Sequence, residues 1–206
     1  MNLGKWLVEQ IINDDKNITR VIALYPGRFQ PCGRHHAEAF RWLQNQFGPE
    51  NTFIVTSDKI DPPKSPFSFK EKKAIINQHG IKNVVNVKNP YKAEELLKKY
   101  DPETTAVVFM VGSKDMSDDP RFTIGKLKSG KNSYFQKYKS GDTLVGYKEH
   151  GYLIVAPHVS LDVPGFGEMS GTALRKALKN STPENFKKIM GWYNPTIYNT
   201  IKKKIN

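Results

Sequence analysis

Short, continuous apolar runs recur along the chain and alternate with segments whose apolar residues repeat at helical spacing. Such a run is typical of a strand that is buried on both faces of a sheet. The pattern predicts strands at about residues 21–24, 52–56, 84–87, 106–111 and 152–156. The first run ends in Tyr25-Pro26-Gly27, where proline stops strand pairing and glycine begins a loop.

Helices are predicted before, between and after these strands. An amphipathic helix is expected near the N-terminus, where Leu3, Leu7 and Ile11 share a face. Ser68 and Glu71 have the spacing of a capping box and begin another helix. Further helices are predicted at about residues 40–47, 93–100, 170–178, 183–190 and 195–205.

Strands that alternate with helices imply right-handed βαβ units and a parallel sheet. The predicted fold is therefore α/β, a Rossmann-like doubly wound parallel sheet of five strands with C-terminal helices. One domain over residues 1–206 is expected, with a core at about 20–180 and C-terminal helices at 181–206. Residues 112–150 lack clean periodicity and are interpreted as an insertion or active-site loop with a hairpin around residues 134–138. Ligands of such sheets bind beyond the carboxyl ends of the strands, so the loops after the first and fifth strands form the candidate site.

The loop after the first strand, residues 27–36, is rich in glycine, arginine and histidine and leads into a helix. Backbone amides at a helix N-terminus attract phosphate, and Gly27 lets the backbone approach a ligand closely. Arg28 and Arg34 add positive charge, and a histidine at the helix start can donate to phosphoryl oxygens. A polar turn with incidental basic residues explains the spacing equally well.

The loop after the fifth strand ends in Ser170-Gly171-Thr172, which can offer amides and hydroxyls to an anion. Arg175 lies about one helical turn further on and can reach the same phosphate. An ordinary helix cap with a surface arginine is the alternative.

Three segments carry a resemblance to a known family. GRFQP followed by a histidine-rich helix start (residues 27–36) resembles the GRFQPxHxGH signature of nucleotidylyltransferases. MSGTALR (169–175) resembles their second signature, (I/M/Y)SGTxxR. SPFSFKEK (65–72) is similar to the NPFTxxER segment of archaeal-type nicotinamide mononucleotide adenylyltransferases. The segments occur in the family's order, and the resemblance spans about residues 20–180.

This resemblance implies a nucleotidyltransferase of the adenylyltransferase type, which binds ATP with Mg²⁺ and transfers AMP to a phosphorylated acceptor with release of pyrophosphate. His36 matches the motif's second histidine, and the catalytic candidates are His36, Arg175 and His35. The nucleotide-binding candidates are Gly27, Arg28, Phe29, Arg34, Ser170, Gly171 and Thr172. Phe67 and Asp115 are candidate acceptor-binding residues, although loop solvation explains Asp115 equally well. No residue is assigned to a metal.

The first signature departs from the family pattern. In register, Gly33 replaces its first histidine, His35 replaces its glycine and Cys32 replaces the usual aromatic residue. Either His35 takes over the missing catalytic role, or the site binds nucleotide but turns over slowly or not at all. Lys72 replaces the arginine of the third segment, which removes a bidentate contact. Cys32 is interpreted as a packing residue, because this chemistry needs no nucleophile.

Composition changes this picture only slightly. The 206 residues carry a formal charge of +12, which suits an anionic partner. The single cysteine fits a reducing compartment. Neither a signal peptide nor an apolar run of membrane-spanning length is recognised, so a cytoplasmic protein without a membrane partner is expected.

The leading hypothesis is an enzyme of NAD biosynthesis that makes a dinucleotide from ATP and nicotinamide mononucleotide. One alternative is a cytidylyltransferase that acts on a sugar or polyol phosphate. The other is a catalytically weakened nucleotide- or RNA-binding module, which the altered motif and the charge suggest. The sequence has no RNA-recognition motif, so nucleic acid is the less favoured partner, and a homo-oligomer is left open.

Overall fold

The computed structural model describes residues 18–116, 122–157, 159, 162–163, 167–168 and 171–205. The helix predicted near Leu3 and the predicted phosphate ligand Ser170 lie outside these residues. Among the described helices, none is long and apolar enough to cross a membrane.

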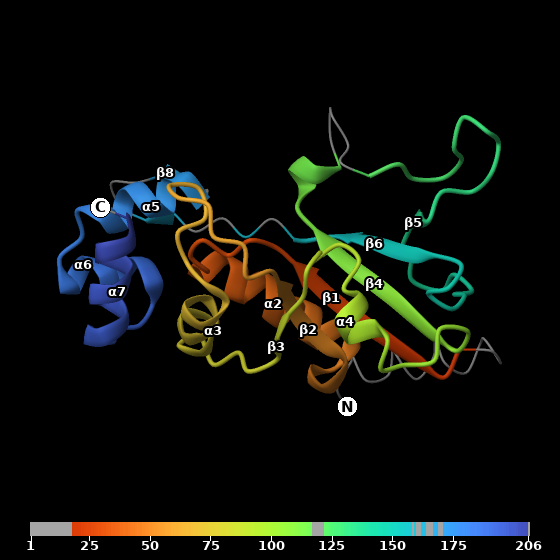
Figure 1. Ribbon diagram of the computed structural model, residues 1–206, viewed down its shortest axis with the longest axis horizontal. Coiled ribbons are helices and arrows are strands. Elements are labelled where there is room, and N and C mark those ends of the chain that lie inside the picture. The colour runs from red at the N-terminus through yellow and green to blue at the C-terminus, as the bar shows by residue number, and fades with distance from the viewer. Residues whose placement is uncertain are drawn as a thin grey trace.

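Six parallel strands form the central sheet, in the order β3-β2-β1-β4-β6-β5 (Figure 1). They are β1 (Arg20–Pro26), β2 (Thr52–Thr56), β3 (Val84–Asn86), β4 (Thr105–Val111), β5 (Phe135–Lys137) and β6 (Gly151–Val155). A separate antiparallel pair is formed by β7 (Asp162–Val163) and β8 (Gly167–Glu168). The α/β parallel sheet predicted from the apolar runs is confirmed, and its strand order reverses between β1 and β4.

The sheet has one strand more than predicted. β5 pairs in parallel with β6, with Phe135 opposite Gly151, so the hairpin predicted around residues 134–138 is wrong. The Phe135 ring packs against Phe109 of β4, with the ring centroids 5.6 Å apart. This contact joins residues that are distant in sequence, and local periodicity does not predict it.

Helices cover both faces of the sheet. They are α2 (Arg34–Phe47), α3 (Phe69–Asn77), α4 (Glu94–Leu97), α5 (Gly171–Lys179), α6 (Pro183–Met190) and α7 (Pro195–Ile205), with 3₁₀ turns η1 (Pro49–Asn51) and η2 (Ser113–Asp115). Leu43 of α2 packs against the face that carries Ala23, and Leu97 of α4 packs against the face that carries Leu24. The alternation of β1 side chains between two clusters explains why its apolar run is continuous.

The helices α5, α6 and α7 gather at the end of the molecule away from β5 (Figure 1). Leu174 of α5 and Phe186 of α6 share a hydrophobic cluster with Phe67, which lies just before α3. Lys204 of α7 donates to the Pro66 carbonyl at 3.3 Å. The C-terminal helices therefore pack beside the segment that follows β2.

Two helix starts follow from the local sequence. The Ser68 N–H donates to Glu71 Oε2 at 2.8 Å, and Ser68 Oγ accepts from the Glu71 N–H at 3.4 Å. This reciprocal pair is the capping box that the spacing predicts. The helix α2 begins at Arg34, directly after an extended Gly33, which places His35 and His36 in its first turn.

Candidate nucleotide site

The loop between β1 and α2 has a conformation that only certain residues allow. Phe29 lies in the left-handed region with φ of 47°, and its ring folds back over Gly27. A Cβ at position 27 would lie 2.9 Å from Phe29 Cε2, so any larger residue would have to displace the buried Phe29 ring. The Phe29 side chain is buried and packs against Tyr25 and His36, with ring centroids 5.2 and 5.4 Å away. Phe29 therefore supports the loop from its buried side, and its ring does not lie at the surface where a nucleotide would bind.

His36 is fixed in one orientation and one protonation state. Its Nδ1 accepts a hydrogen bond from the Gly33 N–H at 3.1 Å. Burial, and then the neighbouring His35 and His79, hold the pKa of the half-buried His36 well below its usual value. The neutral ring therefore carries its proton on Nε2. His36 can offer this Nε2–H as a donor to an anion at the start of α2.

His35 lies beside the position where the motif's first histidine is missing. Its ring lies tilted against the His36 ring, with the centroids 3.9 Å apart. A Cβ at Gly33 would lie 3.1 Å from His35 Cε1 and 2.8 Å from Leu174 Cδ2. The space that a side chain at position 33 would enter is therefore already filled, by the His35 ring and by Leu174 of α5.

Two arginines converge where α5 approaches the first loop. Arg175 Nη1 donates to the Gln30 carbonyl at 2.9 Å, and its Nη2 lies 3.4 Å from Thr172 Oγ1. Burial, and then the positive charge of Arg28, lower the pKa of Arg175. In the part of the chain that the structure describes, neither guanidinium has a carboxylate partner. Gly171 and Thr172 form the exposed start of α5, and the dipole of this helix adds to the positive region.

Gln30 joins the segments that carry the sequence motifs. Its Nε2 donates to the Phe67 carbonyl at 3.1 Å, and its Oε1 accepts from the Phe67 N–H at 2.9 Å. The Gln30 carbonyl in turn accepts from Arg175. Gln30 is 6% exposed and Phe67 is fully buried. The loop after β1, the segment before α3 and the start of α5 are thus held together by one buried side chain, and the Phe67 ring packs in the core instead of facing an acceptor.

Arg34 is directed away from this convergence. Its Nη1 lies 3.5 Å from the Lys188 carbonyl of α6, and a Cβ at Gly191 would lie 3.1 Å from its Cδ. Together with Arg41 and Trp192, Arg34 lines a separate pocket of about 230 Å³. The structure therefore places Arg34 against α6, apart from the contact between Arg175 and Gln30.

Tyr25 lies near the carboxyl end of β1, Tyr91 comes after β3 and Asp115 comes after β4, so all three lie at the carboxyl edge of the sheet. Burial, and then the electrostatic influence of Cys32, Tyr91 and Asp115, raise the pKa of the Tyr25 hydroxyl. Tyr25 also packs against Phe29, so this part of the carboxyl edge is continuous with the loop after β1. Sequence reasoning selected Asp115 but missed both tyrosines. The available signal was the position of Tyr25, at the end of a buried strand and before a glycine loop.

Lys72 and Cys32 have structural surroundings. Lys72 is 1% exposed, and its Nζ donates to Thr56 Oγ1 at 3.1 Å and to the Ser57 carbonyl. Burial lowers the pKa of Lys72 to about 8, and Asp58 opposes this shift. Lys72 therefore fixes the end of β2. Cys32 is fully buried, and burial raises the pKa of its thiol, as expected of a packing residue.

The parallel sheet, its reversal point and the basic helix starts beside it define an α/β protein of the nucleotide-binding class. A family model described as cytidylyltransferase-like matches residues 24–163. The chain belongs to the cytidylyltransferase-like family and is a nucleotidyltransferase. The membership that the sequence motifs predict is confirmed.

Solved structures share this fold. The Plasmodium falciparum nicotinic acid mononucleotide adenylyltransferase complexed with NaAD is 18% identical, with a TM-score of 0.51, and the match covers 89% of this chain and 95% of that one. A bifunctional NMN adenylyltransferase/ADP ribose pyrophosphatase from Francisella tularensis is 20% identical, with a TM-score of 0.50. That match covers 88% of this chain and 48% of the other. A search of curated proteins gave no match.

Proposed function

We propose that this nucleotidyltransferase moves AMP from ATP to the phosphate of a mononucleotide and releases pyrophosphate, with nicotinamide mononucleotide as the first candidate acceptor. The observation that carries the proposal is the hydrogen bond from Arg175 to the Gln30 carbonyl at 2.9 Å. It holds the start of α5 against the loop before α2, so that two helix N-termini and two guanidiniums serve one phosphate chain. The resemblance of residues 65–72 to the nicotinamide mononucleotide group supports the acceptor.

The proposed reaction is an in-line displacement at phosphorus. An oxygen of the acceptor phosphate forms a bond to the α-phosphorus of ATP. The bond from that phosphorus to the oxygen bridging to the β-phosphorus breaks, and pyrophosphate leaves with this oxygen. A phosphate nucleophile carries no proton that must be removed, so the protein acts by positioning the substrates and stabilising negative charge.

Each proposed catalytic side chain has a distinct part in this reaction. Arg28 and Arg175 repel one another in the free protein, and a phosphate between them relieves that repulsion. His36 donates its Nε2–H to a phosphoryl oxygen as a neutral ring, so its contribution does not depend on protonation near pH 7. His35, which lies beside Gly33 and in contact with the His36 ring, supplies the donor that the family places at position 33.

Mg²⁺ is the expected cation, and the donor set fits an ion carried by the triphosphate. Among the described residues, no group of three or more His, Cys, Asp or Glu side chains could hold a metal ion. Asp115 places one carboxylate at the carboxyl edge, within electrostatic reach of Tyr25. A magnesium ion that takes most of its oxygen ligands from phosphate and water needs only one carboxylate from the protein. When bound, the cation neutralises phosphate charge.

The test is pyrophosphate release by the full chain with Mg²⁺, ATP or CTP, and a panel of mononucleotide acceptors led by nicotinamide mononucleotide. Release with ATP and one acceptor is expected. Arg28→Ala and Arg175→Ala should both lose most of the activity, whereas Arg34→Ala is the matched control, because Arg34 contacts α6. Equal losses in all three variants would indicate a general effect of charge and would contradict the assigned site.

His35→Ala tests the donor beside Gly33. We expect a fall in kcat of about 10-fold or more with little change in the KM for ATP, because a preorganised donor acts mainly in the transition state. His35→Gln, which keeps a side-chain N–H, should recover part of the loss. A wild-type rate in His35→Ala would show that His35 does not contribute to the reaction. The proposed roles of His36 and Arg175 would be unaffected by that result.

A further inference from the structure

Tyr25 differs from its neighbours in the strand β1. Residues 21–24 and Pro26 of this strand are buried, whereas Tyr25 is only half-buried. β1 pairs with β2 on one side and with β4 on the other, and the strand order reverses between β1 and β4. Ligands of doubly wound sheets bind beyond the carboxyl ends of the strands at this reversal point. The partly exposed Tyr25 therefore lies where the substrates are expected to meet.

The Tyr25 ring is in contact with the loop that is proposed to bind ATP. It packs edge-to-face on the buried Phe29 ring, with the centroids 5.2 Å apart, and its centroid lies 6.4 Å from that of His36. Phe29 also packs on His36, with the centroids 5.4 Å apart. The three rings form one cluster, so Tyr25 lies beside the histidine that is proposed to donate to a phosphoryl oxygen.

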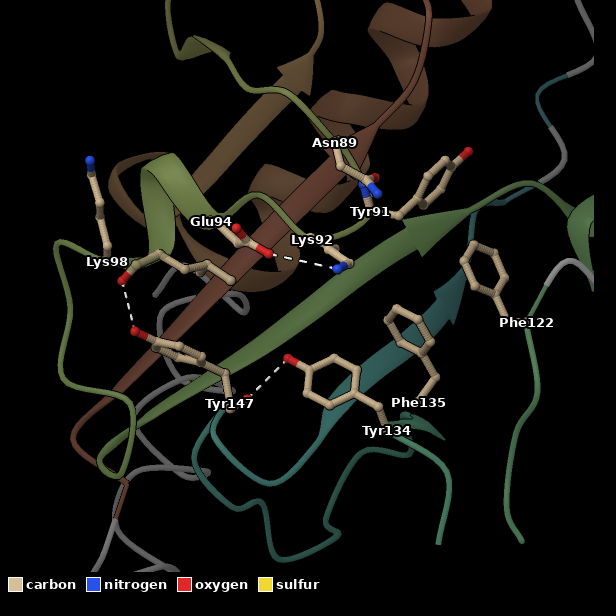
Figure 2. Close-up of a pocket in the computed structure, with 10 residues that line it drawn as sticks. Asn89, Tyr91, Lys92, Glu94, Lys98, Phe122, Tyr134, Phe135 and Tyr147 are labelled. Atoms are coloured by element: carbon tan, nitrogen blue, oxygen red, sulfur yellow. Dashed lines mark hydrogen bonds and ion pairs between the residues drawn. The ribbon is translucent and has the colours of Figure 1, made fainter. Parts of the chain in front are cut away.

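On its other side, Tyr25 lies near groups that follow β3 and β4. Tyr91 and Asp115 are both close enough to influence the ionisation of the Tyr25 hydroxyl. Tyr91 also lines a pocket of about 760 Å³ along β4 (Figure 2). In Figure 2 Tyr91 lies near the carboxyl end of β4, whereas Tyr147, whose N–H donates to the Thr105 carbonyl, lies near the other end. Tyr25 thus lies between the ATP-binding loop and the candidate acceptor residue Asp115.

The Tyr25 hydroxyl is able to donate a hydrogen bond to a ligand. Within the described part of the chain it forms no hydrogen bond with another residue. Because its pKa is raised, first by burial, the hydroxyl keeps its proton at neutral pH. A fixed donor that is partly shielded from water stabilises negative charge more strongly than a donor in bulk water does.

We propose that Tyr25 is a further catalytic residue, whose hydroxyl donates a hydrogen bond to a non-bridging oxygen of the α-phosphate of ATP. This inference rests on the proposed function. The α-phosphate must lie between the two substrates, because its phosphorus belongs to ATP and is attacked by the acceptor. Tyr25 has the same intermediate position, with His36 on one side and Asp115 on the other. The hydrogen bond stabilises charge on the transferring group, and the hydroxyl keeps its proton throughout.

Tyr25→Phe removes the hydroxyl and keeps the ring that packs on Phe29. The kcat for AMP transfer should fall about 10–100-fold, the effect of one hydrogen bond to a charged group, with little change in the KM for ATP. Tyr138→Phe is the matched control and should keep the wild-type rate. Tyr138 is also half-buried, and its ring packs on Phe47, at the end of α2 away from His36. Equal losses in the two variants would overturn the proposal.

Sulfur substitution tests which atom the hydroxyl contacts. Replacing one non-bridging oxygen of the α-phosphate by sulfur gives two diastereomers of ATP, and sulfur accepts a hydrogen bond poorly. The diastereomer that has sulfur at the contacted position has already lost this bond, so Tyr25→Phe should slow its transfer only slightly. Transfer from the other diastereomer should slow about 10-fold or more. Equal slowing of both would show that the hydroxyl acts elsewhere and would overturn the proposal.

Binding of AMP, measured by calorimetry, is a readout that needs no turnover. Tyr25→Phe should weaken AMP binding about 10-fold, because the phosphate loses a donor, and should leave adenosine binding unchanged. Unchanged AMP affinity would overturn the proposal even if the chain transferred AMP to no acceptor. Equal losses for AMP and adenosine would indicate repacking of the site and would overturn it too. A loss confined to AMP, in a chain that transfers no AMP, would contradict the proposed reaction and leave Tyr25 as a phosphate contact only.

Discussion

The buried pair between Gln30 and the Phe67 backbone gives the most direct test of how the site is held together. Gln30→Met keeps the length of the side chain but removes both its donor and its acceptor. The Phe67 N–H donates to Gln30 Oε1 at 2.9 Å and the Phe67 carbonyl accepts from Gln30 Nε2 at 3.1 Å, and both groups would remain buried without partners. Each unsatisfied buried group costs about 1–3 kcal/mol, so the free energy of unfolding should fall by about 2–6 kcal/mol.

Urea unfolding, followed by far-UV circular dichroism, measures this loss. A loss of about 3 kcal/mol corresponds to a fall in Tm of roughly 6–12 °C in a chain of this size. Gln46→Met is the matched control: Gln46 is half-buried on α2 and makes no side-chain hydrogen bond with the described residues, so we expect a change of less than about 0.5 kcal/mol. A Gln30→Met protein as stable as the control would refute the role of this pair.

Three smaller perturbations test other contacts of the site. His36→Ala should lower kcat for pyrophosphate release about 10²–10³-fold, the cost of one preorganised donor, and a change below about threefold would exclude it from the reaction. Gly33→Ala should lower the free energy of unfolding in urea by about 1–3 kcal/mol, because its Cβ would lie 2.8 Å from Leu174 Cδ2. In a Leu174→Ala background the same substitution should lower it by less. Strictly additive losses in the double variant would contradict the clash. Stability should fall as the pH drops from about 6.5 to about 4, because burial lowers the pKa of His79 to about 4 and the unfolded chain takes up the proton first. An unchanged pH slope in His79→Gln would contradict this cause.

Much of the fold could be predicted from the sequence because its signals are local. Strands buried on both faces have continuous apolar runs, and β1, β2, β4 and β6 all show this pattern. The capping box at Ser68 and Glu71 marks the start of α3. The strand β5 escaped prediction because its place depends on Phe135 packing on Phe109, a contact that no local pattern encodes.

The candidate site likewise has features that the local sequence predicts and features that depend on contacts between distant residues. The two glycine-rich loops could be found from their composition, and the structure brings the first loop and the start of α5 together. Which side chains face outward could not be found in this way. Phe29 is turned inward by its left-handed backbone, and Arg34 is drawn to α6. The role of Gln30 depends on the backbone of Phe67, 37 residues away, so the sequence alone does not reveal it.

Transfer of AMP to an acceptor can be followed with ATP that carries ³²P at the α-phosphate. The full chain is incubated with this ATP, Mg²⁺ and nicotinamide mononucleotide, and the products are separated. We expect the label to appear in a dinucleotide, and we expect His36→Ala and Arg175→Ala to prevent this. Label that stays in ATP, or appears only in AMP, with every mononucleotide acceptor would show that the protein does not transfer AMP to such an acceptor.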